Sequence, residues 1–241
     1  MRPLPLLAAS FLVLCPALAQ ASTWDIDPVH STVEFSVRHM MVTTVKGQFQ
    51  KVKGTVELDE KDPTKSTVEV SVETASIDTR EAKRDGHLKS PDFFDAAKFP
   101  AITFKSTKIQ KAGKGKLRVT GDLTMHGVSK PLVLTVEGPS ASIKDPMGRT
   151  VKGVMATGKL DRKDWGMTWN KALDTGGMVV SDEVKLEINA ELAERAATPP
   201  APADKPAAPV AEKPAGAGAK TPPAAPAKPA TPAAAPAKPS K

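Results

Sequence analysis

The side chains best suited to bind a metal or to move protons are four histidines, and they are widely spaced along the chain. They are His30, His39, His87 and His126. A zinc site needs three or four nitrogen, sulfur or oxygen ligands at about 2.0–2.3 Å. No two of these histidines are four residues apart, and His30 and His39 would face opposite sides of one regular strand. The spacing therefore predicts no metal site, although a histidine-based metalloprotein or hydrolase stays open as an alternative.

Motifs for covalent catalysis and phosphate binding are missing from the sequence. No serine lies in a Gly-x-Ser-x-Gly turn, and no glycine-rich phosphate loop is present. The single cysteine, Cys15, falls in an apolar run near the start of the chain. We therefore predict that the protein is not an enzyme, has no catalytic residues and uses no cofactor.

A second polar group, Arg84, Asp85 and His87, lies beside a stretch rich in phenylalanine. One interpretation is structural: an Arg84–Asp85 ion pair fixes a helical segment, and His87 bonds the backbone. The other is that the group contacts the polar head of a ligand, since guanidinium groups suit phosphate oxygens. The residues expected at such a head or at the mouth of a pocket are His39, Arg84, His87 and Arg162.

Hydrophobic residues recur at every second position through most of residues 23–192, which predicts β-strands. Val33, Phe35 and Val37 alternate with polar residues, for example, whereas Phe49 and Val52 are out of phase and indicate a bulge. About eight strands with short turn-rich connections favour antiparallel neighbours. Such strands can close into a barrel, and a two-sheet sandwich is the alternative.

One internal segment breaks this strand pattern. Thr79 is expected to cap a helical stretch over residues 80–89, which ends before Pro91. Asp92 is expected to begin a short turn that continues to Ala97. We therefore predict a short helical insertion that places the neighbouring phenylalanines over the barrel.

The two ends of the chain differ from the middle in composition. Residues 1–21 resemble a secretory signal, with Arg2 before an apolar run and small residues at the expected cleavage site. Residues 197–241 consist mainly of alanine, proline and lysine, which predicts a disordered tail. A single barrel domain is therefore expected over residues 22–196, in the periplasm or outside the cell.

The positive charge of the chain is concentrated in that tail. The formal net charge is +7; six lysines and two acidic residues leave the tail at +4 and Arg2 adds one, so +2 remains for residues 22–196. A domain of such low charge lacks the basic surface of a nucleic-acid-binding protein. The tail is expected to be a solvated linker in loose contact with envelope polymers. A structural envelope protein that acts through the tail is a further alternative.

Several short motifs occur in order along residues 23–192. Together they resemble the YceI-like family, exported lipocalin-like barrels that bind polyisoprenoids and other long apolar molecules. The resemblance implies an eight-stranded antiparallel barrel with a long hydrophobic cavity. The motifs are Trp24-x-Ile26-Asp27-Pro28-x-His30-Ser31, Gly47-x-Phe49, Ile77-Asp78-Thr79, Arg84-Asp85-x-His87-Leu88, Asp92-Phe93-Phe94-Asp95, Phe99-Pro100, Gly121-x-Leu123-Thr124-x-His126-Gly127 and Arg162-x-Asp164-x-Gly166.

Composition alone does not separate a solid core from the lining of a cavity, and the resemblance favours a cavity. It implies a ligand of isoprenoid, quinone-like or fatty-acyl type, held by burial without covalent chemistry. Trp165 stands where the family commonly has phenylalanine, so we expect it to shorten or reshape the cavity. The sequence leaves undecided whether the protein forms a homodimer that covers an exposed opening of the barrel. The apolar residues expected to contact the ligand are Phe35, Val37, Phe49, Val70, Phe93, Phe94, Phe99, Ile102, Phe104, Met125 and Trp165.

Overall fold

The structure is a computed structural model, and it describes residues 21–174 and 176–196. The proposed signal, apart from residue 21, and the proposed tail lie outside these residues, so both stay predictions. Within the two described ranges, no helix has the length and apolar character needed to cross a membrane.

The described chain is built almost entirely from antiparallel strands, with one short helix. The helix α1 covers Ala82–Lys89, and the 3-10 turns η1, η2 and η3 cover Pro63–Lys65, Thr74–Ser76 and Arg162–Trp165. The strands are β1 (Ser22–Ile26), β2 (Thr32–His39), β3 (Thr43–Phe49), β4 (Val52–Leu58), β5 (Thr67–Glu73), β6 (Ile77–Asp78), β7 (Ala101–Lys111), β8 (Lys116–Met125), β9 (Val128–Glu137), β10 (Ile143–Lys144), β11 (Thr150–Asp161) and β12 (Glu183–Glu194).

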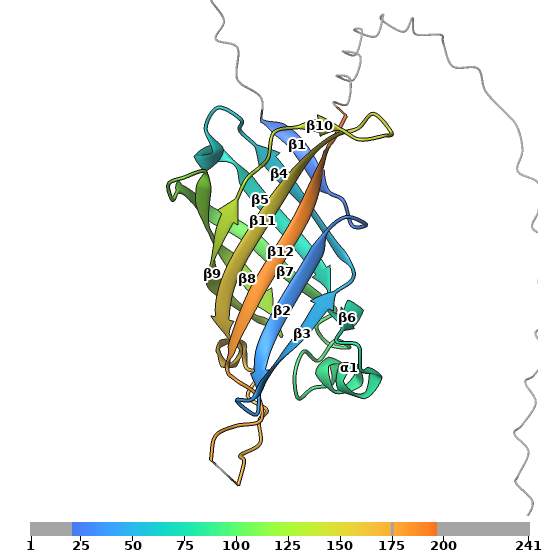
Figure 1. Cartoon of the computed structure of the whole chain (residues 1–241), viewed down its shortest axis with the longest axis vertical. Coiled ribbons are helices and arrows are strands. Elements are labelled where there is room, and N and C mark those ends of the chain that lie inside the picture. Colours follow the sequence, from blue (N-terminus) through green and yellow to red (C-terminus); the bar gives the residue numbers. More distant parts are fainter. Residues whose placement is uncertain (1–20, 175, 197–241) are drawn as a thin grey trace, which may run out of the picture. The chain divides into compact units, whose positions relative to one another are not determined.

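The sheet closes on itself, which confirms the predicted eight-stranded barrel and excludes the two-sheet sandwich (Figure 1). The ring runs β12–β1–β4–β5–β7–β8–β9–β11 and closes where β11 pairs with β12 along the whole of β12 except its last residue. The last residues of β12 pair with β1, and its earlier part pairs with β2. The strands β1 and β2 therefore lie end to end and together occupy one strand position of the barrel wall. The strands β3 and β4 share the next position in the same way.

The predicted irregularity between Phe49 and Val52 is confirmed. Both side chains are buried, although an odd spacing would place them on opposite faces of a regular strand. The β2–β3 ladder ends at Phe49, and the β4–β5 ladder begins at Val52. The break at residues 50 and 51 therefore turns both hydrophobic side chains toward the inside of the barrel.

Two glycines make room for phenylalanine rings inside the barrel. A Cβ atom at Gly47 would collide with the ring of Phe35 and would lie 2.7 Å from the Thr79 methyl group. In the same way, a Cβ atom at Gly121 would collide with the ring of Phe104. Both glycines are therefore required by the close approach of a ring from the neighbouring strand.

The helical insertion is present, but the expected cap was wrong. α1 begins after Glu81, whose carboxylate accepts hydrogen bonds from the backbone N–H groups of Lys83 and Arg84. The Thr79 hydroxyl instead donates to Asp85 Oδ1 at 2.5 Å. Thr79 pairs with a side chain of the helix rather than with its free N–H groups, so the helix starts two residues later than predicted.

The barrel has two unlike ends, which we call the closed end and the loop end (Figure 1). The closed end, at the top of Figure 1, contains β10 and the start of β1. There the ring of Trp24 is 1% exposed, and Lys152 Nζ lies 5.1 Å from its centroid. Lys152 also pairs with Glu60 at 2.8 Å. The loop end contains α1, the β2–β3 turn and the loop between η3 and β12.

Candidate ligand-binding cavity

The interior of the barrel contains an apolar cavity of about 460 Å³. This volume falls in the range of about 300–1,000 Å³ that is typical of small-molecule sites. Inward-facing residues of β2 and β12, such as Phe35, Leu186 and Ile188, line this space and are only partly buried. In a filled barrel these side chains would be fully buried. Their exposure to the interior therefore indicates a hollow and not a solid core.

Most of the apolar residues expected to contact a ligand line this cavity. They come from β2, β3, β5, β7, β8 and the turn that follows α1. Whether they contact a ligand stays a prediction, but their side chains share one continuous space. The lining residues among those predicted are Phe35, Val37, Phe49, Val70, Phe93, Phe94, Ile102, Phe104 and Met125.

Phe99 and Trp165 do not line the cavity. The Phe99 ring packs edge-on against His126, with 5.1 Å between the centroids. Trp165 is 3% exposed; its Nε1 donates to the Leu123 carbonyl at 3.0 Å, and its own carbonyl accepts from His126 Nδ1 at 3.0 Å. The larger ring at position 165 therefore fills the wall beside the β8–β9 turn, and the expected change of cavity shape does not follow from its position.

Aromatic rings connect the helical insertion to the barrel. Phe94, which follows α1, meets Phe49 edge-on with 5.6 Å between the ring centroids. Phe49 in turn lies 5.8 Å from Phe35 on the neighbouring strand. Aromatic pairs at these separations add to the stabilisation from burial alone. The three rings form one side of the cavity next to the loop end.

The predicted Arg84–Asp85 ion pair is replaced by a shared partner, Thr79. Arg84 Nε donates to the Thr79 hydroxyl at 2.7 Å, and Arg84 Nη2 donates to the Thr79 carbonyl at 2.7 Å. Asp85 accepts from the Thr79 N–H at 2.9 Å. Arg84 also lines the cavity. The same guanidinium therefore fixes the start of the insertion and borders the apolar space.

His87 lies between two aromatic rings at the loop end. Its centroid is 5.1 Å from Phe93 and 4.8 Å from Trp169, both edge-on. Its Nε2 lies 2.8 Å from the Asp92 carboxylate, whereas we expected the ring to bond the backbone. The sequence analysis missed Trp169, which also lines the cavity. Trp169 lies in a loop without hydrophobic periodicity, so no pattern in the sequence marks it.

Arg162 is 3% exposed and holds the loop that follows it. Its Nε donates to the Ser181 carbonyl at 3.1 Å, and its Nη1 donates to the carbonyls of Met167 and Trp169 at 2.6 and 2.8 Å. Its Nη2 pairs with Asp182 at 3.0 Å. Arg162 borders the cavity, but its donors are directed at the protein, so its clearest role is to position this loop.

His39 lies at the last position of β2 and lines the cavity at the loop end. Its backbone forms an isolated bridge with Val180. No hydrogen bond from its imidazole to another of the described residues is found. Together with Arg84 and His87, it places polar side chains on the cavity wall at this end.

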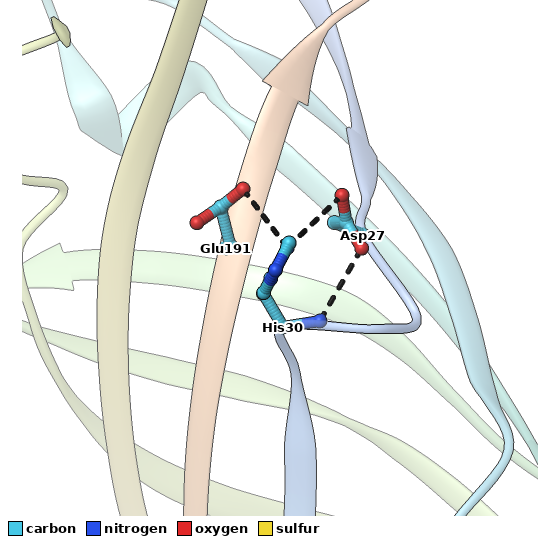
Figure 2. Close-up of side chains that lie close together, drawn as sticks. All are labelled: Asp27, His30 and Glu191. Carbon is cyan, nitrogen blue, oxygen red and sulfur yellow. Dashed lines mark hydrogen bonds and ion pairs between the residues drawn. The ribbon is translucent and has the colours of Figure 1, made fainter. Parts of the chain in front are cut away.

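A separate group of titratable residues lies on the barrel wall. Figure 2 shows the His30 ring between the carboxylates of Asp27 and Glu191, with Nδ1 3.5 Å from an oxygen of each. This spacing is compatible with a bound cation. However, Asp27 Oδ2 accepts from Arg149 at 3.1 Å, and Asp27 Oδ1 accepts from the Val29 N–H at 2.8 Å. A guanidinium thus already neutralises the carboxylate, and we interpret the group as an ion-pair network.

The network lowers the pKa of Asp27. Burial of the carboxyl group raises this pKa, but hydrogen bonds from the Val29 N–H, the Arg149 guanidinium and the His30 N–H outweigh burial. The charged carboxylate is therefore favoured in the folded protein. It connects the β1–β2 junction to the turn that precedes β11.

Solved structures share this architecture. A YceI protein of Campylobacter jejuni is 32% identical, with a TM-score of 0.56 over 65% of this chain and 89% of the other. Burkholderia cenocepacia BcnA has a TM-score of 0.59 at 23% identity, over 69% of this chain and 98% of the other. A domain from Saccharophagus degradans, described as polyisoprenoid-binding, has a TM-score of 0.51 at 14% identity, over 73% and 99%. The last two likenesses concern the fold alone.

Sequence relatives give the family. A UPF0312 protein of Vibrio parahaemolyticus is 42% identical over 62% of this chain and 80% of its own length. A UPF0312 protein of Staphylococcus aureus is 37% identical over 70% of this chain and 96% of its own length. The YceI-like domain model matches residues 24–192, which is nearly the whole described barrel. The chain therefore belongs to the YceI-like family.

Proposed function

We propose that this protein binds the hydrocarbon chain of an isoprenoid, quinone-like or fatty-acyl molecule in its barrel and sequesters or carries it. The observation that carries this proposal is the apolar cavity of about 460 Å³ inside a closed barrel. The description of a solved domain of the same fold as polyisoprenoid-binding supports the ligand class. The protein acts by burial, without covalent chemistry.

The energetics of burial allow useful affinity. Burying roughly 400 Å² of a hydrocarbon chain at about 25 cal/mol/Å² contributes on the order of 10 kcal/mol before the costs of association. Those costs are roughly 4–15 kcal/mol, so at their low end about 6 kcal/mol remains, which corresponds to a dissociation constant of tens of micromolar. Because the hydrophobic effect has no direction, the cavity tolerates related chains, and length and head group decide between them.

The orientation of the ligand follows from the two ends of the barrel. Trp24 is buried at the closed end, while His39, Arg84 and His87 border the cavity toward the loop end. We propose that the hydrocarbon chain points toward Trp24 and that the polar head lies near these three side chains. Arg84 in particular suits an anionic head.

The remaining proposals concern where the protein acts in the cell and what its tail does. We propose that residues 1–21 direct export, so that the barrel domain, residues 22–196, acts in the periplasm or outside the cell. The basic tail, residues 197–241, is proposed to be solvated and to touch envelope polymers only loosely. The small net charge of the barrel domain argues against a nucleic-acid partner.

The proposal is tested by asking whether the cavity is needed for binding. Organic extraction and native mass spectrometry of the purified protein should reveal a long-chain apolar molecule. A dansyl-labelled fatty acid should bind and be displaced by geranylgeraniol. Ile188→Trp places a ring in the cavity and should weaken the binding of this probe at least about tenfold, because the ring takes the space of the chain.

The matched control is Glu187→Trp, which adds the same ring to the next position of β12, where the side chain is exposed. This variant should bind the probe as the unmodified protein does. A protein that carries no apolar molecule and binds neither probe, or an Ile188→Trp variant that binds normally, would contradict the proposal.

A further inference from the structure

Four exposed hydrophobic side chains gather at the loop end, and we call them the methionine tip. Met40, Met41 and Val42 form the β2–β3 turn and are 44%, 61% and 73% exposed. Met178, in the loop that precedes β12, is 47% exposed. Exposed apolar groups that occur together, unlike isolated ones, mark interaction surfaces.

The turn that presents Met40 and Met41 has an unfavourable sequence for its shape. The Val42 N–H donates to the His39 carbonyl at 3.0 Å, and φ is 50° at Met40 and 59° at Met41. Two successive residues with positive φ define a type I′ hairpin turn, which favours Asn-Gly. Methionine at both positions is strained. Strain of this kind is found where the side chains themselves have a use.

Hydrogen bonds join the two segments of the tip. The Met40 N–H donates to the Val179 carbonyl at 2.8 Å, and His39 bridges to Val180. Arg162 anchors the second segment at Ser181. The two segments therefore form one surface, and Met178 is held beside the turn by its neighbour Val179.

The methionine tip lies next to residues that line the cavity. His39 precedes Met40, and Val179 follows Met178; both residues line the cavity. Met40, Met41, Val42 and Met178 do not themselves belong to the lining, so the tip lies next to the cavity wall and not within it. An apolar chain that leaves the cavity between His39 and Val179 would therefore pass beside the tip.

Positive charges flank the methionine tip. Arg38, Lys46, Lys171 and Lys185 are exposed and lie within eight residues of it in sequence. The acidic residues at the same distance are Glu34, Asp174, Asp182 and Glu183, of which Asp182 pairs with Arg162 and Lys163, and Glu183 pairs with Lys159. Among the residues that the structure describes, the Arg38 guanidinium bonds only the Thr44 hydroxyl and the carbonyls of Met41 and Val42. Cations around a small set of apolar side chains complement anionic headgroups above a hydrocarbon layer.

We propose that the methionine tip inserts into an anionic lipid surface and that the cavity exchanges its ligand through this contact. The second half of this statement rests on the proposed lipid-binding function; the first half does not. Methionine suits the contact because its flexible, polarizable side chain adapts to irregular apolar surroundings.

The test uses a variant that should make the fold more stable. Met40→Asn combined with Met41→Gly replaces the strained pair by the residues that a type I′ turn favours. The midpoint of thermal unfolding should rise by about 2–4 °C. Sedimentation with vesicles of phosphatidylglycerol and phosphatidylcholine should show at least about tenfold weaker binding, because two apolar anchors are lost.

Ligand exchange is measured with the same variant. Its affinity for the dansyl-labelled fatty acid in solution should be unchanged, while transfer of this probe from vesicles to the protein should be slower. Met147→Ser removes an exposed methionine at the closed end and is the control; its vesicle binding should equal that of the unmodified protein. Pure phosphatidylcholine vesicles should bind the unmodified protein more weakly than anionic ones.

Two results would overturn the proposal. One is an unmodified protein that does not bind anionic vesicles, which would leave contact with another protein as the use of the tip. The other is a double variant that binds vesicles as well as the unmodified protein. Failure of the cavity proposal is distinguishable, because it would remove probe binding in solution while vesicle binding by the tip remained.

Discussion

The closed end and the loop end of this barrel are built from the same strands but held together by different forces. At the closed end an indole ring is completely buried, and a lysine–glutamate pair lies above it. At the loop end a buried guanidinium binds backbone carbonyls beside the buried ring of Trp165, and four apolar side chains are exposed. Exposed apolar groups occur at both ends, since Ile143 and Met147 are exposed at the closed end, but those at the loop end lie next to residues that line the cavity.

This difference shows how a small barrel can be stable and hollow at once. Burial of apolar surface stabilises the fold, and any side chain that borders a cavity loses part of that contribution. Trp24 is packed on all sides, whereas Phe35 keeps part of its ring exposed to the interior. We expect the closed end to provide most of the stability and the region toward the loop end to tolerate change.

The largest expected effect is at the closed end. Trp24→Ala should lower the free energy of unfolding by about 3–5 kcal/mol, because it removes a fully buried ring and leaves a cavity. Phe35→Ala, the matched truncation inside the hollow, should cost about half as much, since part of that ring is not in contact with protein. Urea unfolding measures both. Equal losses would mean that the two regions are packed alike.

A smaller effect is expected at the loop end, from changing Arg162. Arg162→Lys keeps the charge but loses the planar group that reaches several carbonyls, which should cost about 2 kcal/mol. Hydrogen exchange should become faster in residues 167–181 and stay unchanged in β1. Lys163→Met removes an exposed ion pair with the same partner, Asp182, and should cost less than about 1 kcal/mol. Uniformly faster exchange would show that the two ends are not independent.

The smallest effect is a pH dependence from the barrel wall between the ends. The pKa of Asp27 is lower in the folded protein than in the unfolded chain. Its stabilising contribution is therefore fully present above about pH 4 and is lost as the pH falls toward the lower, folded pKa. In the Asp27→Asn variant, the urea concentration at the midpoint of unfolding should fall less between pH 5 and pH 3 than in the unmodified protein.

The control for this measurement is Asp164→Asn, which removes an exposed pair with Lys130. Exposed ion pairs contribute little to stability, so this variant should follow the pH profile of the unmodified protein. A profile that Asp27→Asn leaves unchanged would show that the network does not contribute to acid sensitivity.

Several elements were predictable from local pattern. The alternation of Val33, Phe35 and Val37 predicted β2, and the change of phase between Phe49 and Val52 predicted the break between β3 and β4. The helical insertion was also predicted, but its cap was not, because Thr79 is of a type preferred at the N-cap of a helix and Glu81 is not. The choice depends on Asp85, which bonds Thr79.

The candidate site was predictable only in part. Most of the predicted apolar residues line the cavity, since the alternation that predicts a strand also says which side chains share a face. Phe99 and Trp165 look the same in sequence but pack into the wall around His126. Trp169 lies in a loop, where no periodicity exists to reveal that it meets His87.

Local sequence patterns were sufficient to predict the strands, their inward faces, the short insertion and the family resemblance, because these depend on residues close together in the chain. The tertiary structure was needed to show that the barrel is hollow, that Trp24 is buried at one end and that exposed methionines from two distant segments gather at the other. Those properties depend on how side chains from distant strands fill, or leave unfilled, the space that the closed sheet encloses.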